Sequence, residues 1–113
     1  MEEQERRRDV RARINIPTFL VRRGAAEPLE LRDASYRGLF LRMEEAPPVR
    51  QLVKLRVKLP TKELELHAVV VRVVEEPSGK RGVGVRFFAL NGQDRADWES
   101  FITSVLHGRV RAA

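Results

Sequence analysis

The sequence contains no cysteine, and this absence excludes several kinds of site at once. Without a thiol there is no disulfide framework, no Cys-ligated zinc and no thiol nucleophile. No wholly apolar run is longer than the one at Ala68–Val71, far short of the ~20 residues that a membrane helix needs. The charged first residues have no apolar run behind them, so we expect neither a secretory signal nor a transit peptide. We therefore expect a cytoplasmic protein without membrane insertion.

The remaining composition fits a single basic domain. A chain of 113 residues has room for one hydrophobic core, and 42% apolar residues suffice to build it. Lys and Arg number 22 against 16 Asp and Glu, a net charge of +6, so an anionic partner is expected first. Aromatic residues are few, with one Trp, one Tyr and five Phe, a poor supply for a surface that stacks nucleic-acid bases.

Alternation of apolar and polar residues predicts an antiparallel all-β fold. The clearest strand is Leu52–Leu59, and a longer one follows at Glu63–Glu75, where a change of phase indicates a bulge. Shorter alternating segments predict four more strands, at 12–20, 29–33, 38–42 and 82–87. Gly and Pro predict a loop at 23–28. Six short strands separated by turns are typical of a sandwich or a barrel.

Only the end of the sequence predicts a long helix. Asn91 is a suitable N-cap and Gly108 a suitable stop. Between them one apolar stripe recurs at helical spacing, made of Trp98, Phe101, Ile102, Val105 and Leu106. We expect this stripe to cover an open end or face of the strands. The predicted organisation is a flexible Arg-rich arm at 1–11, a barrel with its helix at 12–108 and a tail at 109–113.

Patterns for catalysis and metal binding are weak, so we expect no enzyme, no metal and no cofactor. His67 and His107 lie far apart, one on a strand and one at a helix end, without the spacing of a metal site. The carboxylate pairs at 44–45 and 75–76 flank loops and fit solvated strand ends. Gly82-Val83-Gly84 lacks the third glycine and the following helix of a dinucleotide-binding loop.

Two short motifs at consecutive strand boundaries carry the functional signal. Arg7 and Arg11 form an RxxxR just before the first predicted strand, and Asp33, Ser35 and Gly38 form a DxSxxG between the second and third. Taken singly, each has an ordinary explanation, because Asp and Ser are common turn formers and arginines are often solvated. Their order and their placement in an all-β chain are the informative observation.

With these motifs the sequence resembles the PilZ domain family over essentially its whole length. A late strand of the form GxGVxF, at 82–87, and the closing helix complete the resemblance. It implies a six-stranded antiparallel β-barrel with a C-terminal α-helix. It also implies a non-catalytic bacterial second-messenger receptor that binds cyclic di-GMP as a ligand and relays the signal to an unidentified protein effector, in motility, pili, exopolysaccharide or development.

The resemblance assigns the ligand to both motifs and their neighbours. The implied binding residues are Arg6, Arg7, Arg8, Arg11, Asp33, Ser35, Gly38 and Arg86. An arginine fork matches O6 and N7 of guanine in one plane, and a carboxylate can accept from the N–H groups of its Watson–Crick edge. The Ser35 hydroxyl can donate to a phosphate or a base, and Gly38 permits both a positive φ and close backbone approach.

Arg6 precedes the first motif arginine, at a position that in the family influences whether one ligand or an intercalated pair is bound. An arginine there is similar to members that bind the pair, so we expect a pair. Arg8 is expected to add a phosphate contact, and Arg86 on the late strand is a further candidate.

Two alternatives remain open from the sequence. One is a PilZ-like interaction module that does not bind ligand. The other is a basic small barrel that binds nucleic acid, suggested by the pI near 10.7 and by the row Lys54, Arg56 and Lys58. A solvated strand face explains that row more simply, so nucleic acid is not expected as a partner.

Overall fold

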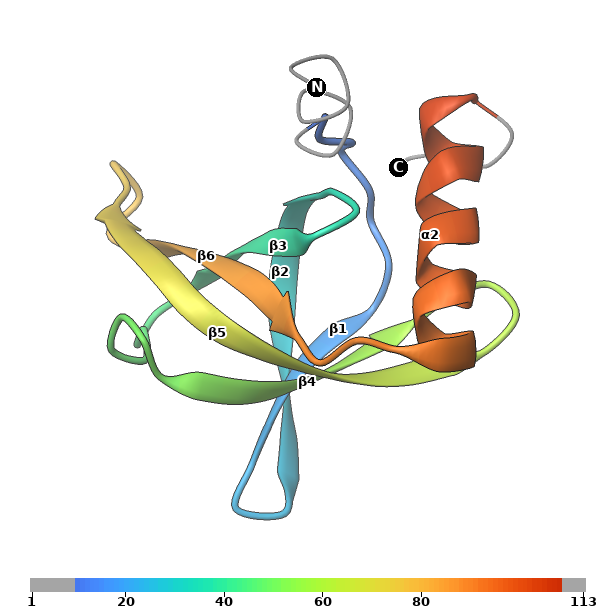
Figure 1. The fold of residues 1–113 in the computed structure, drawn as a ribbon. Helices are drawn as coiled ribbons and strands as arrows, with labels where there is room; N and C mark the ends of the chain where they lie inside the picture. Colours follow the sequence, from blue (N-terminus) through green and yellow to red (C-terminus); the bar gives the residue numbers. More distant parts are fainter. Residues whose placement is uncertain (1–9, 109–113) are drawn as a thin grey trace.

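The computed structural model describes residues 10–108, which form a closed antiparallel barrel of six strands and one helix (Figure 1). The strands are β1 (Thr18–Arg22), β2 (Ala25–Ala34), β3 (Gly38–Met43), β4 (Leu52–Lys58), β5 (Glu63–Glu75) and β6 (Arg81–Phe88). The order around the barrel is β1-β2-β3-β6-β5-β4, and the pairing of β1 with β4 closes it. The predicted six-stranded barrel is confirmed.

The hydrophobic core fills the barrel because each strand turns every second side chain inward. In β4 the buried side chains are Val53, Leu55 and Val57, and in β5 they are Leu64, Leu66, Ala68 and Val70. The register of β5 against β6 shifts between Val70 and Arg72, which confirms the predicted bulge. This extra residue restores the inward phase at Val73, which packs against the core.

Helix α2 (Gly92–Leu106) stands beside the barrel and buries its apolar stripe against the core (Figure 1). Trp98, Phe101, Ile102 and Val105 are buried as predicted. Asn91 is the N-cap by position and has extended backbone, but its side chain makes no capping hydrogen bond. Gly108 ends the helix at a φ of 73°, and its N–H donates to the carbonyl of Val105 at 3.0 Å.

The first predicted strand, 12–20, begins later than the alternation indicates. Ala12 forms an isolated bridge with Ala34, and β1 starts only at Thr18. Pro17 has no N–H to give to a ladder, although its carbonyl accepts from the N–H of Lys58 at 2.9 Å. Ile14 is nevertheless buried, so the inward phase of this segment is right while its secondary structure is not.

The predicted loop at 23–28 is wrong, because most of it belongs to β2. A two-residue turn at Arg23 and Gly24, with φ of 52° and 77°, joins β1 to β2 in a tight hairpin that projects from the barrel (Figure 1). Pro28 is tolerated in this strand because β3 pairs with β2 only from Glu30 onward, which leaves Pro28 at an edge.

Candidate functional site

Arg11, the described arginine of the RxxxR motif, meets Asp33 of the DxSxxG motif on the outside of the barrel beside β2. The Nε–H of Arg11 donates to Oδ1 of Asp33. The backbone holds this contact, because Ala12 and Ala34 exchange two hydrogen bonds of 2.8 and 2.9 Å and fix residue 11 alongside β2. The Arg11 side chain is 42% exposed and that of Asp33 19%, so the pair remains open to a ligand from solvent.

Three of the predicted ligand arginines, Arg6, Arg7 and Arg8, lie outside the described residues, as does most of the predicted arm at 1–11. Of the RxxxR motif, the structure describes Arg11. It brings Arg11 and Asp33 into contact, and it places Ser35 on the β2–β3 turn, Gly38 at the start of β3 and Arg86 on β6.

Ser35 begins the turn between β2 and β3, and this turn is bonded to helix α2. The residue is 3% exposed, its hydroxyl accepts from the N–H of Arg37 at 3.3 Å, and its N–H donates to the carbonyl of Gly38 at 3.0 Å. The indole Nε1–H of Trp98 donates to the Ser35 carbonyl at 3.0 Å. The hydroxyls of Tyr36 and Thr103 form a second bond of 2.7 Å. Two hydrogen bonds therefore join the DxSxxG turn to helix α2.

Gly38 is needed for close approach of two strands. Gly38 does not adopt the positive φ that a glycine permits, since it is outside the left-handed region. A Cβ at this position would collide with the carbonyl oxygen of Val85 on β6 and lie 3.1 Å from its carbonyl carbon. Gly38 is paired with Arg86 across the β3–β6 ladder, which places Arg86 beside the turn on the outer face. The expectation of close backbone approach is therefore right.

A row of four paired residues runs outward from Asp33 across the barrel surface. Asp33 is opposite Phe40 on β3, Phe40 is opposite Gly84 on β6, and Gly84 is opposite Arg72 on β5. Bulges adjoin both ends of the row, between Leu31 and Asp33 and between Val70 and Arg72. Since directly paired residues point to the same side of a sheet, all four belong to the outer face.

Phe40 is the centre of this row and is covered by arginines. The guanidinium carbons of Arg32 and Arg72 lie over its ring, 5.3 and 5.2 Å from the centroid, and leave Phe40 only 5% exposed. The glycines of β6 make room for this stack, because a Cβ at Gly82 would lie 2.5 Å from Cζ of Phe40. We call Arg32, Asp33, Phe40 and Arg72 the outer patch.

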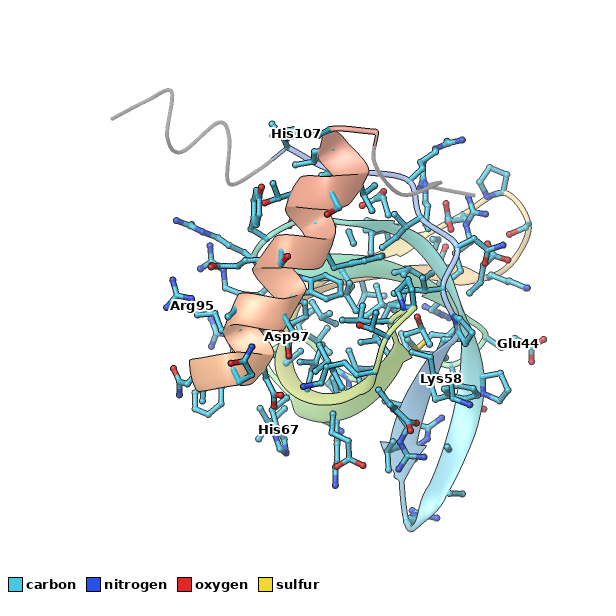
Figure 2. All side chains as sticks on the ribbon, turned by 90° about the vertical axis from the view of Figure 1, so that its right-hand side faces the viewer. Glu44, Lys58, His67, Arg95, Asp97 and His107 are labelled. Atoms are coloured by element: carbon cyan, nitrogen blue, oxygen red, sulfur yellow. The ribbon has the colours of Figure 1, made fainter. Side chains whose placement is uncertain are left out.

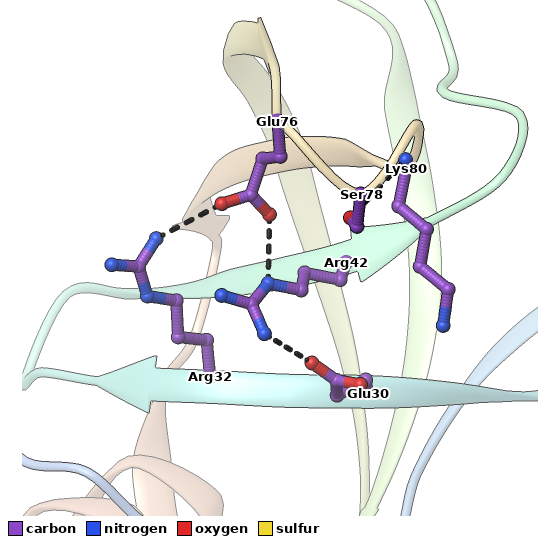
Figure 3. A network of polar contacts seen from close by, with 6 residues as sticks. All are labelled: Glu30, Arg32, Arg42, Glu76, Ser78 and Lys80. Carbon is purple, nitrogen blue, oxygen red and sulfur yellow. Dashed lines mark hydrogen bonds and ion pairs between the residues drawn. The ribbon is translucent and has the colours of Figure 1, made fainter.

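A carboxylate network fixes one side of the outer patch (Figure 3). Glu76 accepts from Nη1 of Arg32 at 3.3 Å and from Nε of Arg42 at 2.7 Å, and Arg42 also donates to Glu30 at 2.7 Å. Hydrogen bonds from Glu30 and Glu76 raise the pKa of Arg42. The Glu76 side chain is 13% exposed, so its predicted place at a solvated strand end is wrong.

The sequence did not indicate Phe40, Arg72 or Glu76 as site residues. Alternation at 38–42 does put Phe40 on the polar side of its strand, and an apolar ring on that side is an available signal. The pairing of β3 with β6 is not readable from the alternation, so the glycines of β6 could not be matched to Phe40.

Two of the three cations of the basic row on β4 pair with acids of the neighbouring strand. Lys54 pairs with Glu65 at 3.2 Å, and Arg56 pairs with Glu65 at 2.9 Å and with Glu63 at 3.4 Å. Hydrogen bonds from Arg56 and then Lys54 lower the pKa of Glu65. The interpretation of the row as simply solvated is therefore incomplete, because β5 supplies matching acids.

Both histidines lie at the surface of the molecule. His67 points out from β5, and His107 caps the C-terminal end of α2 (Figure 2). Within residues 10–108 there is no group of three or more His, Asp or Glu that could hold a metal ion. No helix of the described chain is long and apolar enough to cross a bilayer.

The structure is a small barrel with a cationic outer patch beside a DxSxxG turn. Comparison with known families identifies the family to which this fold belongs. The model of the PilZ domain matches residues 5–104, so the chain belongs to the PilZ domain family. No curated protein matches the sequence.

Several solved structures share the fold. The inhibitor of motility MotI/DgrA of Bacillus subtilis has a TM-score of 0.74 at 16% identity, over 88% of this chain and 49% of that one. The PilZ domain of YcgR from Escherichia coli, solved with c-di-GMP, has a TM-score of 0.64 at 13% identity, over 88% and 91%. PlzA of Borreliella burgdorferi, also in complex with c-di-GMP, has a TM-score of 0.63 at 9% identity, over 99% and 57%. The chain thus spans about half the length of MotI/DgrA.

Proposed function

We propose that this PilZ domain is a non-catalytic cytoplasmic receptor for cyclic di-GMP. The observation that supports the proposal is the contact of Arg11, the second arginine of RxxxR, with Asp33, the first residue of DxSxxG. Further support comes from the family membership and from the c-di-GMP in the structures of the YcgR domain and PlzA.

The chemistry of the outer face suits a guanine dinucleotide. Arg11 would present its fork to O6 and N7 of one guanine, and Asp33 would accept from N–H groups of the Watson–Crick edge. The guanidinium planes of Arg32 and Arg72, supported by Phe40, offer a cationic floor on which a purine can stack. Ser35 would contribute by shaping the turn or by turning its hydroxyl to the ligand, and Arg86 beside Gly38 would contact a phosphate.

The domain organisation that follows has three parts. Residues 12–108 would form the ligand-binding body, 1–11 an arm that closes over the seated ligand, and 109–113 a tail. Arg6, Arg7 and Arg8 of the arm would add charge-assisted contacts and allow an intercalated pair. Ordering the arm costs entropy, which these contacts must exceed. A changed surface would then recruit or release a protein effector.

Titration calorimetry with cyclic di-GMP tests the receptor proposal. We expect wild type to bind at tens of micromolar ligand or below, and Arg11→Ala and Asp33→Ala each to weaken binding at least roughly tenfold, because each removes a charge-assisted contact. Arg22→Ala is the matched control, since Arg22 pairs with Glu27 at 2.9 Å on the β1–β2 hairpin.

Absence of heat with wild type would overturn the receptor proposal. Equal binding by Arg11→Ala, Asp33→Ala and Arg22→Ala would move the ligand away from the two motifs. Full biological activity in Arg11→Ala with loss of ligand binding would favour the interaction module that signals without ligand.

A further inference from the structure

A concave surface lies between the DxSxxG turn and helix α2. It is a cleft of about 640 Å³, whose walls include Tyr36, Arg37, Arg86, Phe87, Arg95 and Glu99. Three separate segments meet there: the β2–β3 turn, the end of β6 and α2. At its base Ala89 adopts a φ of 56°, costly for a residue with a Cβ, where the chain turns from β6 into the helix. We call this the helix-side cleft.

Arginines dominate the charge of the helix-side cleft. Arg37 and Arg86 have no carboxylate within 4.0 Å among residues 10–108, so their charges are available to a ligand. Arg95, which points outward in Figure 2, donates from Nε to Glu99 at 3.2 Å. One cleft arginine therefore already engages a carboxylate of the same wall.

The lining favours carboxylates on a peptide over a phosphate chain. Glu99 on the wall repels a dense negative charge such as a polyphosphate or a nucleic-acid backbone. Apolar surface lies between the arginines, from Leu90 and from the partly buried Phe87, whose ring meets Trp98 edge-on at 5.2 Å. Separated acids with apolar side chains between them match this alternation of charge and apolar surface.

We propose that the helix-side cleft binds an acidic, partly apolar segment of a partner protein. Its carboxylates pair with Arg37 and Arg95, and its apolar side chains contact Phe87 and Leu90. The inference goes beyond the proposed receptor function, because the cleft is competent without a dinucleotide. Tyr36 and Thr103, bonded at 2.7 Å, both line the cleft, so the partner contacts the same turn that carries the ligand motif.

The test uses the full ¹⁵N-labelled chain and a capped peptide of alternating glutamate and leucine. We expect saturable shifts of the Nε–Hε signals of Arg37 and Arg95 with no dinucleotide present. Arg37→Glu and Arg95→Glu are each expected to weaken peptide binding by roughly tenfold or more. Lys80→Glu is the matched charge reversal, at the β5–β6 turn and away from the cleft.

Any one of four results would overturn the proposal. Peptide shifts located on the Lys54–Lys58 row, or equal affinities for Arg95→Glu and Lys80→Glu, would remove the peptide from the cleft. Tighter binding of pyrophosphate or a single-stranded oligonucleotide than of the peptide would make the cleft a phosphate site. Competitive displacement of the peptide by cyclic di-GMP would make the cleft part of the dinucleotide site. A silent cyclic di-GMP titration with intact peptide binding would overturn the receptor function alone.

Discussion

At the scale of single residues, three glycines decide how closely β3, β5 and β6 lie together. Gly38 faces the backbone of Val85, Gly82 faces the ring of Phe40, and Gly84 faces the side chain of Arg72. These neighbours differ in their freedom to move: a backbone carbonyl in a ladder is fixed, a packed ring moves little, and an exposed arginine chain moves easily. The three positions should therefore differ in their tolerance of a methyl group.

We expect Gly38→Ala to lower the free energy of unfolding by about 3 kcal/mol, because the strands must separate to admit the new Cβ. Gly84→Ala, the matched control, should cost less than about 1 kcal/mol, because its nearest neighbour is Cγ of Arg72 at 3.1 Å. Urea unfolding measures both. Similar losses of unfolding free energy in the two variants would show that the backbone of the β3–β6 ladder moves as easily as the Arg72 side chain.

The site residues that could be predicted from the sequence are those that belong to short, local motifs. Asp33 and Arg11 belong to short motifs, and their contact needs only the bridge between Ala12 and Ala34. Phe40 and Arg72 gain their role from strand pairings across the barrel, which alternation within one strand does not specify. Arg86 was predicted as a site residue from its place on the late strand. Arg37 was not predicted, because only the structure shows that it lines the helix-side cleft.

At the scale of elements, the bounds of a strand were predicted best where apolar and polar residues alternate most regularly. The bounds of β5 match the prediction and those of β4 differ by one residue, since both strands are half-buried with a period of two, which in β5 is regular as far as its bulge. The hairpin of β1 and β2 was misread because Gly24 and Pro28 look like loop residues in isolation. Partner strands decide such cases, and partner strands are a property of the whole fold.

Helix α2 is tied at its first turns to the loop before β5. Nζ of Lys62 donates to Asp97 at 2.7 Å and lies 3.7 Å from Asp94, and Gln93 donates to Asp97 at 2.8 Å. The hydrogen bonds from Lys62 and then Gln93 lower the pKa of Asp97. A lowered carboxyl pKa means that the folded state favours the ionised form, so this contact stabilises the fold at neutral pH.

We expect Asp97→Asn to unfold at a lower temperature than wild type at pH 7. The difference should persist above the usual Asp pKa of ~3.9 and shrink as the pH falls through the lower pKa of the folded state. Thermal unfolding followed by circular dichroism from pH 7 to pH 2 measures it. Asp94→Asn is the control, with a smaller effect expected from its longer contact. A difference that stays constant at every pH would mean that the ion pair is not its source.

At the scale of the whole molecule, the net charge of +6 is unevenly spread. Lys54 and Arg56 of the β4 row are matched by Glu63 and Glu65, and Arg42 is matched by Glu30 and Glu76. Arg37 and Arg86, by contrast, face solvent near the DxSxxG turn without an acid within 4.0 Å in the described chain. The net charge alone is thus a poor guide to where an anion binds.

We expect only weak, non-specific binding of random single-stranded DNA, with a Kd above roughly 100 µM at 0.15 M salt, because Lys54 and Arg56 of the β4 row are already paired with acids. The double variant Glu63→Gln, Glu65→Gln should bind more tightly and with a steeper dependence on salt. Fluorescence anisotropy of a labelled oligonucleotide measures both. Micromolar binding by wild type with a steep salt dependence would revive the nucleic-acid alternative.

The bond between Trp98 and Ser35 has a spectroscopic consequence. Trp98 is the sole tryptophan of the chain and is fully buried, with its indole N–H held by the carbonyl that begins the DxSxxG turn. The emission of this one fluorophore therefore reports the local environment where turn and helix meet. Movement of the turn away from α2 would admit water to the indole and shift its emission to the red, with no label and no substitution required.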